Sequence, residues 1–204
     1  VESANIETSI TVPDGRWVLG TSGPLRGPAV RFWSILVCSL LAAWALGRIP
    51  SSPLRTLEWM LLALGLTQVP VPAALLIVAW LFFLVLRGRE ACVVLPPLRF
   101  NLVQIALILL TTIALGIFVA VVAAGLLGNP QMFILGNGST RTFLRWYLPQ
   151  SESLLPQPGC FTVSHWWYRL LMLVWALWLA VSLLRWLRWG WDQFSKGGCF
   201  RGKK

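Results

Sequence analysis

Acidic side chains and histidine are scarce in this chain of 204 residues, which holds seven Asp and Glu residues in total and one His. Charged residues make up 12% of the sequence, about half of the roughly 25% found in globular domains. Carboxylate pairs, triads and metal centres need several such side chains to converge. The composition therefore argues against these active sites, while a hydrophobic content of 57% favours a chain solvated by lipid.

Short catalytic and metal-binding motifs are also missing from the sequence. It contains no phosphate-binding loop and no HExxH, GxSxG or CxxC pattern. An enzyme within the membrane would bury ionisable residues in mid-span, where each costs roughly 2.5 to 3.5 kcal/mol on insertion scales. Glu58 follows Arg55 by three residues and is interpreted as half of an interfacial ion pair, and His165 as a headgroup-level residue. We predict a non-enzymatic protein with no catalytic residues, no cofactor and no metal site.

The four cysteines, at positions 38, 92, 160 and 199, lie far apart in the sequence. Their spacing matches neither zinc nor redox motifs. In the topology argued below only Cys160 faces the outside, so an internal disulfide is not expected.

The first 30 residues read as β-structure and a linker rather than as a helix. Residues 6–12 alternate apolar and polar side chains, the period of a half-buried strand. The turn sequence Pro13-Asp14-Gly15 follows, and a second short strand over 16–20 completes a predicted β-hairpin. Because two strands are marginally stable alone, this extracytoplasmic hairpin is expected to close a larger domain upstream of Val1.

Long apolar runs dominate residues 31–188, so the expected fold class is an all-α integral membrane protein with about five transmembrane helices. The runs 32–47, 100–127 and 166–188 each predict one span. The apolar region 54–87 is too long for one straight crossing and contains Pro70 and Pro72, so we interpret it as a proline-split hairpin of two short helices. A four-span alternative, in which 54–87 crosses once, remains open.

The distribution of Lys and Arg predicts the orientation. With five spans and an external amino terminus, 11 of the 17 basic residues lie on the cytoplasmic side, where membrane proteins carry their excess of positive charge. The loop 129–165, with an Asn137-Gly138 turn inside a predicted short hairpin, is then external, and the basic tail 189–204 is cytoplasmic. In the four-span alternative 12 of the 17 lie inside and the tail is again cytoplasmic.

Small residues recur at every fourth position in two predicted helices, which favours close helix packing in lipid. The predicted packing residues are Ser39, Ala43 and Gly47 in the first span and Thr112, Gly116, Ala120 and Ala124 in the fourth. Four polar residues of that fourth span are interpreted as interhelical hydrogen-bonding groups, with a path lining as the alternative: Asn101, Gln104, Thr111 and Thr112.

The last span carries a ridge of tryptophans with two arginines near its end. These predicted lipid-contacting or partner-contacting residues are Trp175, Trp178, Trp186, Trp189, Arg185 and Arg188. The ridge is interpreted as a lipid-facing or bundle-packing stripe, with partner recognition as the alternative. Mixed cations and indoles at this end are also what anionic inner-leaflet lipid attracts.

Three segments together resemble the carboxyl-terminal region of large proteobacterial inner-membrane proteins. They are WWYRLLMLVWALWLAVSLLRWLRWGWDQFS at 166–195, GNPQMFILGNGS at 128–139 and PDGRWVLGTSG at 13–23. The resemblance implies a bacterial inner membrane and a periplasmic part upstream, and it implies no reaction.

These observations predict a non-enzymatic anchor or assembly module of a bacterial inner membrane. Its expected partners are the lipid bilayer and other membrane helices or subunits. Nucleic acid is excluded because the basic residues flank apolar runs instead of gathering on one polar domain. The alternative function is a subunit of a transport or envelope-assembly complex, with a pathway near Pro70 and Pro72.

Overall fold

The computed structural model describes residues 3–23, 27–89, 96–151, 157–196 and 198. The chain forms two compact units, each built from two separate stretches of sequence. Residues 1–38 and 128–171 form the β unit, and residues 39–127 and 172–204 form the helical unit. Helices α1 and α6, whose bounds are given below, each begin in the first unit and continue into the second.

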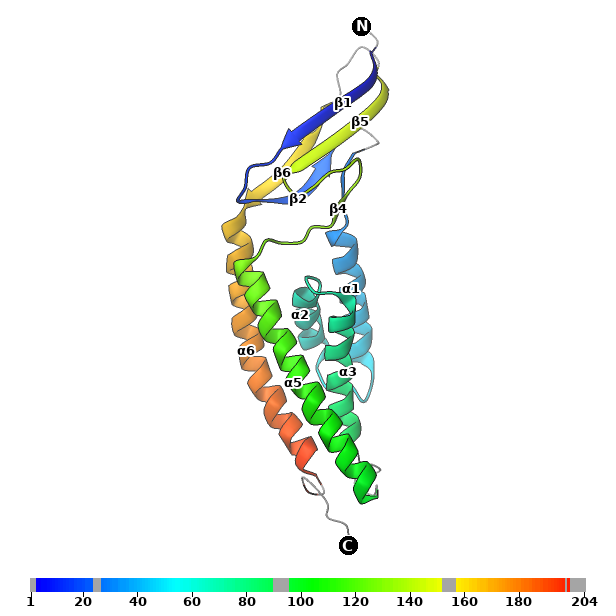
Figure 1. The fold of residues 1–204 in the computed structure, drawn as a ribbon, viewed down its shortest axis with the longest axis vertical. Helices are drawn as coiled ribbons and strands as arrows, with labels where there is room; N and C mark the ends of the chain where they lie inside the picture. The colour runs from blue at the N-terminus through cyan, green and yellow to red at the C-terminus, as the bar shows by residue number, and fades with distance from the viewer. Residues whose placement is uncertain (1–2, 24–26, 90–95, 152–156, 197, 199–204) are drawn as a thin grey trace. The chain divides into compact units, whose positions relative to one another are not determined.

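The β unit consists of three antiparallel strand pairs (Figure 1). Strand β1 (Ser3–Thr11) pairs with β5 (Phe143–Ser151), and β2 (Arg16–Ser22) pairs with β6 (Gly159–Ser164). The short strands β3 (Ala29–Val30) and β4 (Ile134–Leu135) form the third pair. Every pair thus joins the amino-terminal segment to the segment between α5 and α6.

The predicted hairpins are therefore wrong, although the predicted amino-terminal strands are present. Gly15 adopts a φ of +89° in the turn between β1 and β2, as the turn sequence requires. The two strands nevertheless bond to β5 and β6 and not to each other. A hairpin around Asn137 is likewise replaced by pairing of β4 with β3 and of β5 with β1. The partners that the structure shows for β1 and β2 come from within this chain.

One small apolar core explains this pairing. Val12, Val18, Leu144 and Trp146 are at most 5% exposed and pack together, so the β1–β5 and β2–β6 pairs share one interior. Burying an aliphatic or aromatic side chain contributes about 1.5 to 3 kcal/mol. A local β1–β2 hairpin alone would leave these side chains without the β5 residues that cover them.

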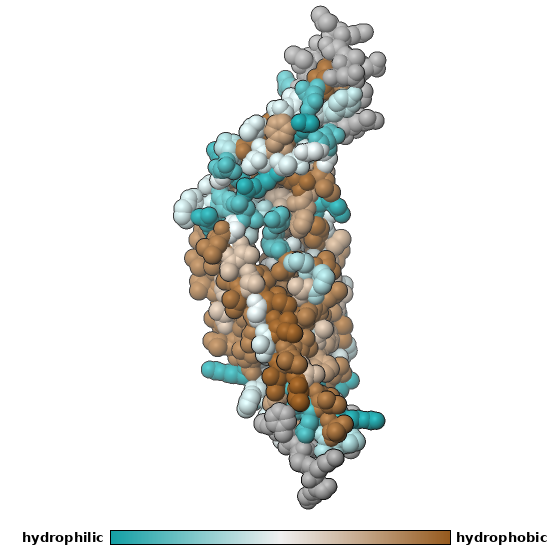
Figure 2. Space-filling model, viewed as in Figure 1, coloured by the Kyte–Doolittle hydropathy of each residue, from teal (hydrophilic) through white to brown (hydrophobic). Residues whose placement is uncertain are grey.

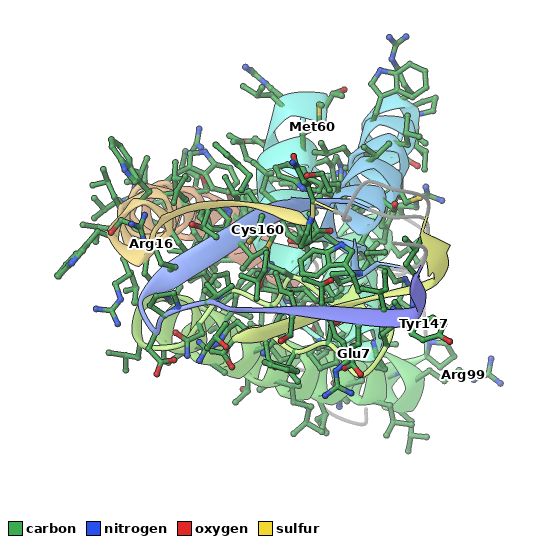
Figure 3. The ribbon with its side chains drawn as sticks, turned by 90° about the horizontal axis from the view of Figure 1, so that it is seen from above. Glu7, Arg16, Met60, Arg99, Tyr147 and Cys160 are labelled. Carbon is green, nitrogen blue, oxygen red and sulfur yellow. The ribbon has the colours of Figure 1, made fainter. Side chains whose placement is uncertain are left out.

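Cys160 on β6 packs against this core, and burial raises the pKa of its thiol (Figure 3). Because the thiolate is the reactive form, we expect Cys160 to react slowly with a maleimide at neutral pH and faster as the pH rises. The test measures labelling rates from pH 7 to 10 in a variant whose other cysteines are serine. The control is Ser9→Cys in a cysteine-free background, since Ser9 is exposed on β1. Equal rates for the two thiols at pH 7 would contradict the prediction.

Five described helices follow or frame the strands. They are α1 (Phe32–Arg48), α2 (Thr56–Leu66), α3 (Val71–Arg87), α5 (Pro97–Leu127) and α6 (His165–Ser195). Helix α6 continues past the predicted end of the last span at 188, so positions 189–195 of the predicted tail are helical.

The expected fold class is wrong, because two of the described helices, and not five, are long and apolar enough to cross a membrane. These are α5 and α6, each of 31 residues, or about 47 Å of helix. Helices α1 and α3 have 17 residues and α2 has 11, so they reach about 26 and 17 Å against a hydrocarbon core of about 30 Å. The three strand pairs also make the chain a mixed α and β protein.

The chain does break at the two prolines, as their sequence positions predict. Helix α2 ends at Leu66, Pro70 is the N-cap of α3, and Pro72 lies in the first turn of α3, where its missing N–H costs no helix hydrogen bond. The rings of Trp59 and Phe82 stack with centroids 6.0 Å apart. The two short helices thus pack together inside the helical unit.

Candidate site at the ends of α3, α5 and α6

Arg87, in the last turn of α3, is a charged residue buried almost completely, with 1% exposure. Its Nε donates a hydrogen bond to Oε1 of Gln104 at 2.9 Å. Its guanidinium also lies over the ring of Phe100, 4.5 Å from the centroid. Burying a cation is costly unless hydrogen bonds compensate, and the first turns of α5 supply both contacts.

Arg87 also binds the carboxyl end of α6. Its Nη2 donates to the carbonyl oxygens of Phe194 and Lys196 at 3.1 and 2.8 Å. The last carbonyls of a helix have no partner within the helix and carry partial negative charge, so a guanidinium is well suited to this position. Gln104, 0% exposed, donates from Nε2 to the same Phe194 carbonyl at 3.1 Å. We name Arg87, Gln104 and the Phe194 and Lys196 carbonyls the Arg87 cluster.

A second set of contacts joins α3 to α6 beside this cluster. A Cβ added to Gly88 would overlap the side-chain amide of Gln193, so the absence of a side chain at 88 allows the close approach. Gln193 Oε1 accepts a hydrogen bond from Lys196 Nζ at 2.8 Å. The end of α6 is therefore bound by Arg87 of α3 and Gln104 of α5, and it also lies close to Gly88.

An apolar cavity of about 210 Å³ lies among α3, α5 and α6, one helical turn from the Arg87 cluster. Phe194 belongs to both features, since its side chain lines the cavity and its carbonyl accepts from Arg87 and Gln104. The lining is almost entirely apolar: Trp80, Leu84, Leu107, Ile108, Thr111, Thr112, Trp186, Leu187, Gly190, Trp191 and Phe194.

Two indole groups of the cavity lining differ in their hydrogen bonding. Trp80 Nε1 donates to Thr111 Oγ1 at 2.9 Å, which confirms the predicted interhelical role of Thr111. Trp186 is 4% exposed, and its buried Nε1 has no acceptor among the described residues. A buried donor left without a partner costs about 1 to 3 kcal/mol.

Within this chain, the predicted small-residue positions of α1 pack and those of α5 are exposed. Ala43 is 3% exposed, and a Cβ on Gly47 would collide with Thr56 at the start of α2. Ser39 is half-buried. The four α5 positions, in contrast, are exposed, and no described atom lies within 4 Å of a Cβ built on Gly116. The exposed positions are Thr112, Gly116, Ala120 and Ala124.

The buried stripe of α5 follows a different spacing. Its buried residues follow a heptad repeat, in which steps of three and four residues add to seven. They are Phe100, Gln104, Leu107, Ala114, Phe118, Val121 and Gly125. Four residues rotate a helix by about 400°, so a strict fourth-residue series drifts about 40° per step away from any fixed face. The predicted series begins at Thr112, about 200° around the helix from the buried Ala114, so it lies on the side opposite the packed stripe.

The tryptophan ridge of α6 is partly buried in the helical unit. Trp175 Nε1 donates to the Leu61 carbonyl of α2 at 2.7 Å, and Trp186 packs with Trp178 at a centroid separation of 6.1 Å. Trp178 and Trp189 are half-buried. Trp175 therefore contacts α2, whereas Trp178 and Trp186 contact each other within α6.

The two predicted arginines of α6 differ in their contacts. Arg188 is exposed, whereas Arg185 Nη2 lies 3.4 Å from Glu58 Oε1 and 3.0 Å from Ser182 Oγ. Glu58 therefore pairs with Arg185 instead of the predicted Arg55. From Arg55 it accepts a hydrogen bond of the backbone N–H. His165, at the start of α6, is buried against Tyr168.

Sequence reasoning found Gln104 but missed Arg87, which ends the predicted apolar region 54–87. Basic residues at the end of an apolar run are normally interfacial, so no sequence signal separates Arg87 from Arg89. Among the described residues, no three His, Cys, Asp or Glu side chains form a metal-binding group, and Cys38 and Cys160 are free thiols. The predictions for Cys92, Cys199 and positions 199–204 of the tail concern residues outside the described ones. Comparisons with protein-family models, curated proteins and solved structures found no match to this chain.

Proposed function

We propose that this chain is a non-enzymatic membrane module that anchors the β unit on the outer face of a bacterial inner membrane through α5 and α6. The supporting observation is the exposure of their most apolar stretches, of which only 22% and 28% are buried. Exposed apolar side chains cover much of the helical unit in the view of Figure 2. In water, such a surface would be far larger than the few hundred Å² that monomeric soluble proteins expose.

Chain connectivity supports the placement of the β unit on one side. The segment 128–164 joins the end of α5 to the start of α6, so two antiparallel spans keep it on a single face of the membrane. Strands β1 and β2 pair with β5 and β6 of that segment, so the amino-terminal strands lie on the same face. Helices α1, α2 and α3 pack within the helical unit. They connect the amino-terminal strands to the start of α5, which lies on the other face of the membrane.

Charge supports the direction. The start of α5 and the ends of α3 and α6 carry Arg89, Arg99, Arg188 and Lys196. Because Lys and Arg are enriched on the cytoplasmic side, these helix ends face the cytoplasm and the β unit faces outward. The resemblance to proteobacterial inner-membrane proteins supports the same location.

Two measurements test this proposal. The protein is expected to remain in bacterial membranes after alkaline carbonate extraction. In a cysteine-free background, Ser9→Cys is expected to react with an impermeant maleimide in intact spheroplasts, and Ser195→Cys only after permeabilisation. Release by carbonate would contradict membrane insertion, and labelling of Ser195→Cys alone in intact spheroplasts would reverse the orientation.

Membership of a larger transport or assembly complex is the second candidate function. The exposed small-residue side of α5, where Gly116 has open space beside it, favours a further helix at this position. The cavity described above is not lined by Pro70 or Pro72, so it gives no support to a pathway at the prolines. Isolation from native membranes without a stoichiometric partner would count against this function.

A further inference from the structure

We propose that the cavity among α3, α5 and α6 holds part of one acyl chain of an anionic phospholipid, whose phosphate lies among the cations at these helix ends. The inference rests on the proposed membrane location and names a ligand that anchoring alone does not require. Two features of the helical unit carry it: the apolar lining of the cavity and the positive charge at the helix ends.

The cavity suits a section of an apolar chain. Its volume of about 210 Å³ is below the roughly 300 to 1,000 Å³ of pockets that enclose a whole small molecule. Its two hydroxyl-bearing residues are occupied, because Thr111 Oγ1 donates to Leu107 O at 2.7 Å and Thr112 Oγ1 to Ile108 O at 3.0 Å. The lining therefore offers van der Waals contact and little polarity, which an acyl chain matches.

Charge selects an anionic headgroup. The described ends of α3, α5 and α6, with the residues next to them, carry four exposed cations and one exposed carboxylate, Asp192 of α6. The cations are Arg89, Arg99, Arg188 and Lys196. Arg87 is buried in its own cluster and Arg185 is paired with Glu58 of α2, so the positive excess at these ends comes from the four exposed cations. Basic pockets between membrane helices on the cytoplasmic side bind anionic lipid headgroups, and this end is the cytoplasmic one in the proposed orientation.

The experiment uses the full chain, purified in a neutral detergent and washed free of lipid. Phosphatidylglycerol and phosphatidylcholine with identical acyl chains are then added separately, and bound phospholipid is measured by native mass spectrometry. We expect tighter binding of phosphatidylglycerol. Ile108→Trp, which places bulk at the cavity, should remove this binding, whereas Ile105→Trp should not, because Ile105 is similarly exposed on α5 but does not line the cavity.

Two double variants that each remove two positive charges test whether the lipid headgroup binds at these helix ends. Arg99→Ala/Arg188→Ala is expected to weaken phosphatidylglycerol binding by about tenfold or more, since each basic residue near the surface contributes about fivefold. Arg48→Ala/Arg55→Ala removes the same charge at the connection between α1 and α2 and should have little effect.

Equal affinity for the two lipids, or equal loss in the two tryptophan variants, would overturn the inference. A change of oligomeric state in Ile108→Trp with unchanged lipid binding would also overturn it, because a second copy of the chain would then be the occupant. In each case retention in carbonate-washed membranes would leave the proposed function standing. Release by carbonate would contradict both the proposed function and the lipid-binding inference.

Discussion

Replacement of Arg87 by alanine is expected to lower the free energy of unfolding of the helical unit by about 2 to 4 kcal/mol. The substitution removes the donor to Gln104 Oε1 and the donors to the Phe194 and Lys196 carbonyls. Hydrogen bonds to charged groups are worth about 1.5 to 3 kcal/mol each, and a buried acceptor left unmade adds to the loss. The loss also includes the packing of the guanidinium on Phe100.

The measurement is unfolding in mixed micelles with increasing denaturing detergent, followed by tryptophan fluorescence. Arg89→Ala is the matched control, because it removes a charge two residues away that lies outside the Arg87 cluster, and it should change stability by at most about 0.5 kcal/mol. Arg87→Lys keeps the charge but loses the planar fork that reaches several acceptors, so an intermediate loss is expected. Similar losses in Arg87→Ala and Arg89→Ala would contradict the assigned role of the cluster.

A double-mutant cycle separates the Arg87–Gln104 bond from general disruption. Gln104→Leu alone leaves the Arg87 Nε without its acceptor, and Arg87→Ala alone leaves the Gln104 Oε1 without its donor. The two substitutions together should cost less than the sum of the single losses, with a coupling of about 0.5 to 3 kcal/mol. Additive losses would mean that the hydrogen bond from Arg87 Nε to Gln104 Oε1, 2.9 Å long, makes no specific contribution to the free energy of unfolding.

The strands of the β unit show which part of the fold could be predicted. Alternation at residues 6–12 and the turn at Gly15 are local signals, and they located β1 and β2 correctly. Partner choice depends on which residues complete a core, and here Leu144 and Trp146 come from more than 120 residues along the chain. No single-sequence pattern records that distance, so the hairpin was the natural but wrong prediction.

Helix α5 shows a limit of a different kind. It is apolar on every side, so hydrophobicity does not mark the packed face, and small residues served as the only guide. Two regular series exist on this helix, the four-residue series that ends at Ala124 and the heptad series that ends at Gly125. The two series lie on opposite sides of the helix, so a regular spacing alone does not show which side packs.

Gly65→Ala is expected to destabilise the helical unit by about 1 to 3 kcal/mol, the usual cost of overpacking. A Cβ at this position on α2 would overlap the indole of Trp175. The indole cannot easily move, because Trp175 is 8% exposed and its Nε1 bonds the Leu61 carbonyl at 2.7 Å. Gly116→Ala, in open space on α5, should instead stabilise by up to about 0.5 to 1 kcal/mol through higher helix propensity.

The overlap involves three carbons of the six-membered ring of the Trp175 indole, Cζ2, Cε2 and Cη2, which identifies a compensating change. Phenylalanine at 175 lacks the second ring, so Trp175→Phe provides space for the methyl group while it loses the bond to Leu61. If contact with Trp175 is the reason for glycine at 65, Gly65→Ala should cost much less in the Trp175→Phe background than in the native chain. An unchanged cost in that background would place the constraint elsewhere on α2, and micelle unfolding of the four variants distinguishes the two results.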